Sequence, residues 1–509
     1  PVILRKRRLF SRLASPRRFP RRVLPLKVLF VSPEVEPFVK VGGLADMVGS
    51  LPKALAALGH DVRVVFPAYG SLRLDSAWRA RLEPLGVDVG PGARWARTWE
   101  SVLPGSQVPV YALEHEEYFA RPGVYYGSAG DFPDNDLRFA FLCRGALNLC
   151  LQLGWIPDVV HVHDWTTGLL PVLLNTTLRN TPLGRTASVF TIHNLEHQGY
   201  CDRRVVDFAH LPPAEFRSDS LESAGAVNMM KAGLYHATKL TTVSPTYAEE
   251  IKTPAGGFGL DHVLRFRAAD LLGILNGIDA AAWNPAMDKH LPRPYDQRSL
   301  AEGKAAAKAA LQRRLGLAVD PHVAVFGVVS RFASQKGLDL LAEALPHILD
   351  RMHVQFALLG AGDPGLEHSF RWAAEAFPGR VGVHVGYDNA LAHLIQGGSD
   401  FFVMPSRAEP CGLTQMYAMR YGTAPIVRST GGLIDTVSQF VEGKDLGTGF
   451  RFTDATAPAL YNTIGWACAT YYDRPDELHA LRLRGMAQDF SWNVSARRYE
   501  EVYGWAAEA

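Results

Sequence analysis

The sequence predicts an α/β protein in which two doubly wound parallel sheets face each other across a deep cleft. Strand-like runs rich in Val and Ile alternate with helical stretches along most of the chain, which is typical of parallel sheets covered on both faces. The runs form two series, separated by "NGIDAAAWNPAMDKHLPRPYD" at 276–296, whose Pro, Asn and Asp residues favour a hinge. In such sheets ligands bind beyond the carboxyl ends of the strands, so the cleft is the expected site.

Each run predicts a buried strand, because it consists mainly of apolar residues, many of them β-branched, and is flanked by turn-forming residues. The first series covers 27–32, 61–68, 158–164, 188–193, 239–244 and 271–277, and the second covers 322–330, 354–360, 380–386, 400–406 and 423–429. The Ala- and Lys-rich segment 301–316 predicts an exposed helix, and 491–506 predicts a terminal helix.

Four segments are predicted from this order. Residues 1–26 form a basic tail that is expected to be disordered, and residues 27–280 form the first domain. Residues 281–487 form the second domain. Residues 488–509 form a terminal helix that is expected to cross back to the first domain. A chain of 509 residues is too long for a single core, in agreement with two domains.

The composition excludes several classes of protein. The net charge of +2 is misleading, because residues 1–27 hold ten Lys or Arg and no acid, which leaves the rest of the chain acidic. No broad basic surface for nucleic acid is therefore expected. No apolar run approaches the roughly 20 residues that span a bilayer, so no membrane segment is expected either.

The five cysteines are scattered and include no C-x-x-C pair. This pattern suits a reducing compartment and argues against a structural zinc site. The Arg-rich N-terminus lacks the apolar core of a secretory signal. It is interpreted as a disordered tail or as upstream sequence from a misplaced start, in a bacterial cytoplasmic protein. The alternative is a transit peptide, which would place the protein in the plastid stroma.

The segment "VKVGGLADMVGSLPKAL" at 39–55 follows the first strand. The apolar residues that recur at helical spacing are Leu44, Met47, Val48, Leu51, Leu55 and Leu58. Gly42 and Gly43 therefore lie at a helix entrance, where free N–H groups and the helix dipole favour an anion. Lys40 would add a full positive charge there, although a tight turn with a solvated lysine explains the same residues.

A second candidate anion site lies in the second series. In "SRFASQKG", Arg331 and Lys336 follow a strand and together suggest a clamp for a diphosphate. In "MPSRAEPCGLTQMYAMRYG", a helix is expected to begin near Gly412, with its N–H groups facing an anion and Glu409 just outside. A carboxylate there would orient a sugar hydroxyl and stabilise positive charge that develops at an anomeric carbon.

Two further strand ends carry polar residues. "HVHDW" places Asp164 at the mouth of one strand, and "TIHN" places His193 and Asn194 at the mouth of the next. The H-x-H pair could bind a metal, but packing histidines in a buried strand are favoured because no third ligand is apparent. "GAGDPG" contains a formal G-x-G-x-x-G, which supports a dinucleotide site only weakly because Pro364 interrupts it.

The motifs together resemble one family. Those that occur in the family's order are "KVGGLADMVGSLPKAL", "HDWTTGLLP", "FTIHNLEHQG", "NGID", "SRFASQKG", "GAGDP" and "PSRAEPCGLTQMYAMRYGTAPIVRSTGGLIDTV". From about residue 27 to 505, the chain resembles the bacterial glycogen synthases and plant starch synthases. These are retaining glycosyltransferases with two Rossmann-like domains (the GT-B type). The resemblance implies transfer of glucose from ADP-glucose to the non-reducing end of an α-1,4-glucan such as glycogen, starch or a maltooligosaccharide.

The resemblance also implies roles for individual residues. Lys40 and Gly43 would contact the diphosphate and sugar of the donor. Asp164, His193 and Asn194 would line the sugar pocket, with Asn276 nearby. Arg331 and Lys336 would neutralise the leaving diphosphate, and Tyr387 would stack near the base. The residues expected to hold the glucose and the distal phosphate are Glu409, Cys411, Gly412, Leu413 and Thr414, with Gly431 and Gly432 close by. The residues expected to be catalytic are Glu409, His193, Arg331 and Lys336.

No metal and no cofactor are expected, because basic side chains would neutralise the departing diphosphate. Three alternatives remain at this point. Other retaining transferases, of the sucrose or trehalose type, often carry a second glutamate where this chain has Tyr417. A nicotinamide-dependent dehydrogenase would explain "GAGDPG" but not Lys40 or the "EPCGLT" segment. A non-catalytic glucan-binding relative is expected to have lost Lys40, Arg331, Lys336 or Glu409, and all four are present.

Overall fold

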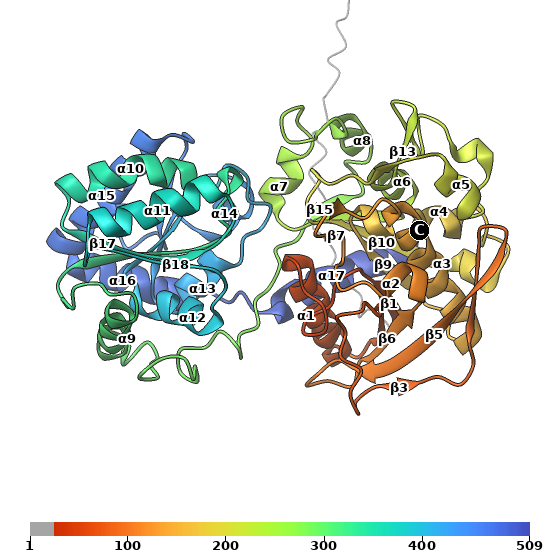
Figure 1. Ribbon diagram of the computed structural model, residues 1–509, viewed down its shortest axis with the longest axis horizontal. Coiled ribbons are helices and arrows are strands. Elements are labelled where there is room, and N and C mark those ends of the chain that lie inside the picture. Colours follow the sequence, from red (N-terminus) through yellow and green to blue (C-terminus); the bar gives the residue numbers. More distant parts are fainter. Residues whose placement is uncertain (1–24) are drawn as a thin grey trace, which may run out of the picture.

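The computed structural model describes residues 25–509 and shows two α/β lobes side by side (Figure 1). Each lobe contains a mainly parallel sheet with helices on both faces, which confirms the predicted fold class. The basic tail lies outside the described residues, except for residues 25 and 26.

The first lobe contains a ten-stranded sheet. Its strands are β1 (Lys27–Val31), β2 (Asp61–Pro67), β3 (Arg79–Ala80), β4 (Leu85–Val89), β5 (Gly92–Val102), β6 (Pro109–Glu114), β9 (Val159–His163), β10 (Ala187–Ile192), β14 (Lys239–Thr242) and β15 (Leu271–Gly273). The order is β15-β14-β10-β9-β1-β2-β6-β5-β3, with β4 paired to β5. The strands from β15 to β6 are parallel, whereas β3, β4 and β5 add an antiparallel edge.

The helices of this lobe are α1 (Gly43–Ala57), α2 (Glu116–Phe119), α3 (Asn135–Leu153), α4 (Leu169–Asn175), α5 (Arg204–Phe208), α6 (Met229–His236), α7 (Pro245–Glu250) and α8 (Asp261–Phe266). Two small sheets complete it: β7 (Tyr126–Gly127) with β8 (Gly130–Asp131), and β11 (Tyr200–Cys201), β13 (Ala226–Asn228) and β12 (Glu222–Ser223). The chain leaves β1 toward β2 on one side of the sheet and continues from β9 on the other. The switch point of this sheet therefore lies between β1 and β9.

The second lobe contains a six-stranded parallel sheet. Its strands are β16 (Ala324–Val329), β17 (Val354–Gly360), β18 (Val381–Val385), β19 (Phe401–Met404), β20 (Ala424–Arg428) and β21 (Phe450–Phe452). Its helices are α9 (Leu300–Arg314), α10 (Leu338–Arg351), α11 (Pro364–Ala376), α12 (Asn389–Gly398), α13 (Thr414–Arg420), α14 (Gly431–Thr436), α15 (Ala457–Asp473) and α16 (Pro475–Met486). The order β18-β17-β16-β19-β20-β21 puts the switch point between β16 and β19.

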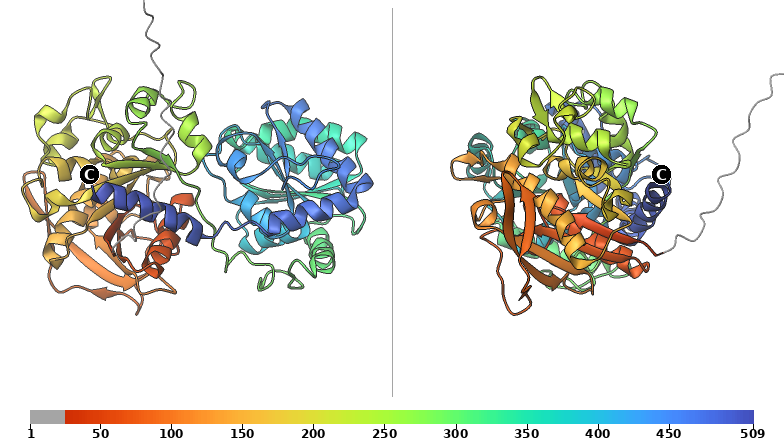
Figure 2. Two further views of the ribbon diagram at one scale, coloured as in Figure 1. Left: turned by 180° about the vertical axis from the view of Figure 1, so that it is seen from behind. Right: turned by 90° about the vertical axis from the view of Figure 1, so that its right-hand side faces the viewer.

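The last helix, α17 (Trp492–Ala507), returns to the first lobe and packs on α1, β9 and β10, as the view from behind shows (Figure 2). The two connections between the lobes run side by side, with Ile278 bridged in parallel to Ser491. Gly277 allows this approach, because a Cβ there would lie 2.6 Å from the backbone of Trp492. The boundaries predicted at residues 280 and 487 fall in these two connections.

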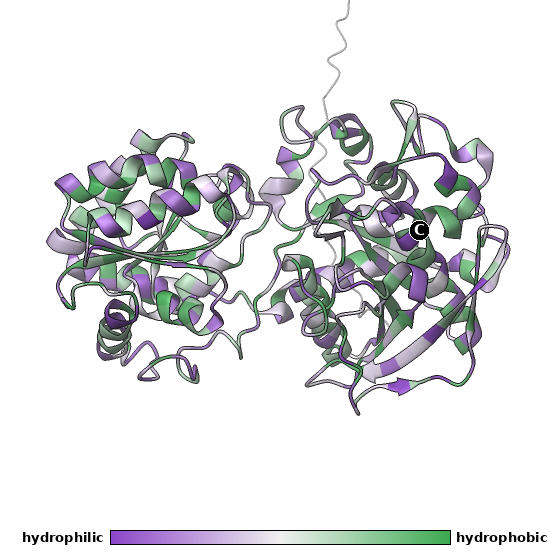
Figure 3. Ribbon diagram, in the orientation of Figure 1, coloured by the Kyte–Doolittle hydropathy of each residue, from purple (hydrophilic) through white to green (hydrophobic). Residues whose placement is uncertain are grey.

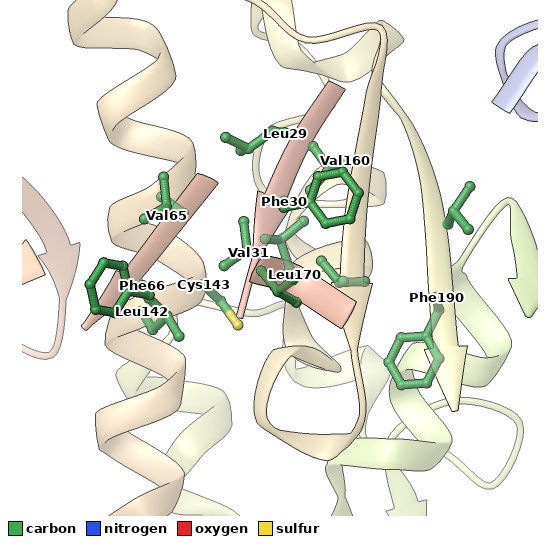
Figure 4. Close-up of a cluster of buried hydrophobic side chains, with 14 of the residues drawn as sticks. Leu29, Phe30, Val31, Val65, Phe66, Leu142, Cys143, Val160, Leu170 and Phe190 are labelled. Atoms are coloured by element: carbon green, nitrogen blue, oxygen red, sulfur yellow. The ribbon is translucent and has the colours of Figure 1, made fainter. Parts of the chain in front are cut away.

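Burial of the strands explains why the apolar runs fold as they do. Side chains from β1, β2, β9 and β10 meet α3 and α4 in one cluster (Figure 4). The residues labelled there are Leu29, Phe30, Val31, Val65, Phe66, Leu142, Cys143, Val160, Leu170 and Phe190, all buried. Colouring by hydropathy shows the apolar residues gathered on the strands and the inner helix faces of both lobes (Figure 3).

Candidate active site

A pocket of about 180 Å³ opens at the switch point of the second sheet. Its lining comes mainly from the segments that follow β16 and β19: Val329, Ser330, Arg331, Lys336, Leu338, Val403, Met404, Pro405, Ser406, Glu409, Gly412, Leu413 and Thr414. Six residues predicted from the sequence, namely Arg331, Lys336, Glu409, Gly412, Leu413 and Thr414, therefore lie together.

The centre of this pocket is an ion pair between Lys336 and Glu409. Lys336 Nζ donates to both carboxylate oxygens of Glu409, at 2.9 and 2.7 Å. Ser406 Oγ donates to the same carboxylate at 3.0 Å. The Glu409 side chain is 8% exposed and that of Lys336 is 22% exposed. The carboxylate is thus fixed in place while the ammonium group stays accessible.

A glycine allows the two loops to meet here. Lys336 ends a single turn of 3₁₀-helix, and Gly337 follows with φ of 67°. A Cβ on Gly337 would lie 1.9 Å from the carbonyl oxygen of Pro405. Only glycine accommodates both the left-handed backbone and this close approach, which brings Lys336 within reach of Glu409. Arg331 lies in the same loop, between β16 and the 3₁₀ turn, and is exposed at the mouth of the pocket.

The helix predicted to begin near Gly412 begins instead at Thr414, with Leu413 as its N-cap. Gly412 has a φ of 73°, a left-handed conformation that belongs to a turn before the helix. The helix therefore starts within two residues of the predicted position. Gly412, Leu413 and Thr414 still border the pocket.

Gly431 and Gly432 hold α14 against the "EPC" turn. A Cβ on Gly431 would lie 2.0 Å from the carbonyl oxygen of Glu409, and one on Gly432 would lie 2.1 Å from that of Cys411. Gly432 N–H donates to the Glu409 carbonyl at 3.1 Å. Both glycines therefore shape the backbone around Glu409.

Two helices from different lobes bind each other's N-termini. Gly431 N–H, at the start of α14, donates to Glu250 Oε1 of α7 at 2.8 Å. In return, Thr246 in α7 donates its N–H and hydroxyl to Asp435 of α14, each at 2.8 Å. Nothing in the sequence signals this contact, because it joins residues more than 180 positions apart.

In the first lobe the predicted anion site at the α1 entrance is occupied by carboxylates of the protein itself. Val41 and Gly42 donate their N–H groups to Glu34 Oε2 at 2.6 and 2.8 Å. Lys40 pairs with Asp46 at 2.6 Å and with Glu36 at 3.6 Å. The helix does begin at Gly43, as predicted. Glu34 was not among the site residues predicted from the sequence, although its place shortly after the first strand puts it at the switch point.

The pKa of Lys40 reflects its pairing with two neighbouring carboxylates. Burial lowers the pKa of Lys40, but the charge and hydrogen bond of Asp46 and the charge of Glu36 outweigh burial and raise it above its ordinary value. The hydroxyl of Tyr387, from the second lobe, contributes to the same rise. Tyr387 lies beyond β18 and is 89% exposed, and its hydroxyl donates to Asn389 Oδ1 at 3.4 Å.

Asp164, His193 and Asn194 lie at the adjacent ends of β9 and β10 in the first lobe. Asp164 Oδ1 accepts the backbone N–H groups of His193 at 2.7 Å and of Asn194 at 3.4 Å. Asp164 has a φ of 53°, a strained conformation for a non-glycine residue, as is often found at functional sites. Burial raises the pKa of Asp164 to about 7 and lowers that of His193 to about 3.

Asn276 and Cys411 meet between the lobes. Burial raises the pKa of the Cys411 thiol to about 12, opposed by the backbone N–H of Asn276. Asn276 is itself buried, and its side-chain oxygen has no partner within residues 25–509. The thiol is therefore protonated near neutral pH.

Tyr417, at the position where related transferases carry a second acid, has a packing role that the sequence did not reveal. Its ring stacks on Trp283 at 3.9 Å between centroids, and Trp283 stacks on His393 at 3.8 Å. Trp283 belongs to the connection between the lobes, so the stack anchors that connection to the second lobe.

Across residues 25–509, no group of three or more His, Cys, Asp and Glu side chains is arranged to hold a metal ion. Within the same range, no helix has both the length and the apolar character needed to cross a bilayer.

Comparisons with known proteins agree with this architecture. Residues 27–266 match the model of the starch synthase catalytic domain, and residues 313–468 match that of glycosyl transferases group 1. The two matches and the paired sheets define the chain as a glycosyltransferase with two Rossmann-like domains.

The full-length relatives are more specific. Glycogen synthase 1 of Geobacter metallireducens is 48% identical over 484 residues, covering 94% of this chain and 96% of that protein. Glycogen synthase of Myxococcus xanthus is 47% identical, covering 94% and 99%. The catalytic domain of starch synthase IV from Arabidopsis thaliana, solved with ADP and acarbose, superposes with a TM-score of 0.87 at 34% identity, covering 96% of this chain and all of that one. The chain belongs to the glycogen synthase family.

Proposed function

We propose that this protein transfers glucose from ADP-glucose to the non-reducing end of an α-1,4-glucan, with retention of configuration. The observation that carries the proposal is the Glu409 carboxylate, held by Lys336 and Ser406 in a pocket that Arg331 also lines. A fixed carboxylate beside two cations suits a reaction in which a diphosphate departs and positive charge develops at the sugar.

The roles divide between the lobes. Arg331 and Lys336, with Lys40 from the opposite lobe, neutralise the leaving diphosphate. The N–H groups of Gly412 to Thr414 hold the distal phosphate, and Glu409 faces the glucose. The family name of the relatives and the ADP in the starch synthase IV structure support the choice of donor.

The remaining predicted residues complete the donor site in this proposal. Asp164, His193 and Asn194 bind the sugar from the first lobe. Asn276 and Cys411 close the pocket where the lobes meet, and Tyr387 lies beside the base. Gly431 and Gly432 keep the backbone close to the glucose.

The proposed chemistry assigns charge neutralisation to side chains and needs no cofactor. Retention follows if the acceptor hydroxyl attacks from the face that the diphosphate leaves, with the departing phosphate taking up the acceptor's proton. Lys336, Arg331 and Lys40 then stabilise the charge of the leaving group throughout.

The glucosyl transfer is proposed to take place in the bacterial cytoplasm. The two glycogen synthases compared above are bacterial. The five cysteines of the described chain are all unpaired thiols: Cys143, Cys150, Cys201, Cys411 and Cys468. Unpaired cysteines suit a reducing compartment.

The experiment compares radiolabelled ADP-glucose and UDP-glucose as donors, with glycogen as the acceptor. ADP-glucose is expected to exceed UDP-glucose by at least ~10-fold in kcat/KM, equivalent to about 1.4 kcal/mol of transition-state discrimination. Equal use of UDP-glucose, or transfer to fructose or a glucose phosphate in place of glucan, would refute the proposal.

A further inference from the structure

Two histidine rings touch at the carboxyl ends of β9 and β10 in the first sheet. His163 ends β9 and is fully buried, and His193 directly follows the neighbouring strand β10. The strands are parallel, with Thr191 opposite His163. His163 Nδ1 lies 3.3 Å from His193 Nε2, within hydrogen-bond distance.

The His163 ring is fixed by its surroundings. It packs on Phe30, with 5.9 Å between ring centroids, and on His161, at 4.4 Å. His161 has no free nitrogen for it, because its Nδ1 bonds to Tyr503 OH at 2.7 Å and its Nε2 to Thr191 Oγ1 at 2.6 Å. The contact with His193 is therefore the only ring hydrogen bond of His163 within residues 25–509.

Both rings are neutral, since burial lowers the pKa of each well below neutrality. A neutral imidazole has one N–H donor and one bare acceptor nitrogen. One ring must therefore donate and the other accept, and the position of one hydrogen determines the tautomer of both rings.

The buried side of His163 decides between the two arrangements. His163 Nε2 is buried and has no hydrogen-bond partner among the described residues. A buried N–H donor left without a partner is rarer and more costly than a bare acceptor. The hydrogen of His163 therefore belongs on Nδ1, which donates to His193 Nε2. His193 must then carry its own hydrogen on Nδ1.

The Nδ1 of His193 is available for a ligand. It makes no hydrogen bond within residues 25–509, and it is not among the buried side-chain atoms that lack a partner, so it is open to solvent. The backbone N–H of His193 is held by Asp164, which fixes the position of the residue at the strand end.

We propose that His163 is a positioning residue that holds His193 as its Nδ1–H tautomer, so that His193 offers a neutral hydrogen-bond donor to an oxygen of the bound sugar. The part concerning the sugar rests on the proposed function. No proton is transferred in this role. His193 contributes a fixed dipole in place of a base.

The kinetic test uses substitutions that separate the donor from the packing. An asparagine amide N–H can take the place of Nδ1–H, so His163→Asn is expected to keep kcat within about threefold of wild type. His163→Leu, which fills the space without a donor, is expected to lose at least ~10-fold in kcat. His163→Gln is the matched control, because its amide reaches further and is expected not to rescue.

A double-mutant cycle shows whether His163 acts through His193. In a His193→Ala background, His163→Leu is expected to cost nothing further, because the group that it positions is gone. Additive losses, or a His163→Asn variant as slow as His163→Leu, would overturn the proposal. If His163→Asn is slow, an unchanged thermal unfolding temperature and an unchanged ADP affinity exclude misfolding as the cause of the slow rate.

The tautomer can be read without any turnover. With ¹⁵N-labelled histidine, the ring signals of His193 are identified by their loss in His193→Asn. They are expected to show a protonated Nδ1 and a bare Nε2. A protonated Nε2 would refute the positioning role. This result is independent of the donor assay, so failure of ADP-glucose transfer and failure of the positioning role are distinguishable.

Discussion

Replacing Glu409 with glutamine is expected to move ADP affinity and turnover in opposite directions. The amide keeps the volume of the side chain and can still accept the hydrogen bond from Ser406. It removes the negative charge that now receives two hydrogen bonds from Lys336, at 2.9 and 2.7 Å. Lys336 then becomes free to bind a diphosphate without giving up a charged partner.

The magnitude follows from the burial of the pair. A hydrogen bond between charged groups contributes about 1.5–3 kcal/mol. Since Lys336 is 22% exposed and therefore partly hydrated, the lower end applies. Without the Glu409 carboxylate, ADP no longer competes with it for Lys336. ADP binding is therefore expected to tighten by roughly tenfold, or about 1.4 kcal/mol. Turnover is expected to fall by at least ~10², the scale of removing one preorganised electrostatic group.

The assay pairs titration calorimetry of ADP with the glucan transfer rate. Glu375→Gln is the matched control, because Glu375 is exposed on α11 and the substitution changes the net charge equally. The control is expected to leave both quantities unchanged. If Glu409→Gln weakened ADP binding, the carboxylate would be part of the ADP site and not a competitor for Lys336. Near-normal turnover in a folded variant would remove Glu409 from the mechanism.

Three further outcomes are expected. Lys336→Ala should weaken ADP binding by at least ~10-fold, because it removes a cation and leaves the Glu409 carboxylate facing the diphosphate; unchanged affinity by calorimetry would contradict this. Asp164 has a pKa raised to about 7, so kcat/KM should rise as pH passes about 7 and the sugar-binding carboxylate ionises. The contribution of Asp164 to folding stability should decrease as the pH rises from about 4 to about 7. Over that range the folded state keeps the proton on Asp164, whereas the unfolded state has lost it. Asp164→Asn should flatten both profiles, and a persistent acid limb would assign it to another group. Finally, adding ADP and a short glucan should reduce the radius of gyration in solution scattering, because the site is divided between two lobes; an unchanged radius would count against closure.

The sequence predicted the second-lobe pocket because its residues follow recognisable strands. Arg331 and Lys336 come after the run at 322–330, and Glu409 comes after the run at 400–406. The carboxyl ends of parallel strands share one edge of a sheet, so such residues meet whenever their strands are neighbours. The adjacency of β16 and β19 is a tertiary fact, however, and no local pattern encodes it.

The partners of these residues were less predictable. The sequence placed an anion site at the α1 entrance, but it did not show that Glu34 already accepts the N–H groups of Val41 and Gly42. The pairing of Glu250 with Gly431 joins different lobes and was equally hidden. Such contacts depend on how loops pack after the sheets have formed.

The antiparallel edge of the first sheet was missed for a different reason. Continuous apolar runs predict strands of a buried parallel sheet, whereas β5 has one solvated face. In its residues 92–102, "GARWARTWESV", the two Arg residues at 94 and 97 are three positions apart, so the period of two is weak. An edge strand of this kind is identified by its partner β6 more than by its own sequence.

The return of α17 to the first lobe affects the order in which a newly made chain can fold. Tyr499 and Tyr503 of α17 are buried in the core of that lobe, and Tyr503 bonds to His161 in its central sheet. During synthesis, domains commonly fold one after another from the N-terminus. Here the second lobe is fully synthesised before the last helix of the first emerges. The first lobe must therefore wait, with the surface under α17 uncovered, until the whole second lobe and then α17 itself have been synthesised.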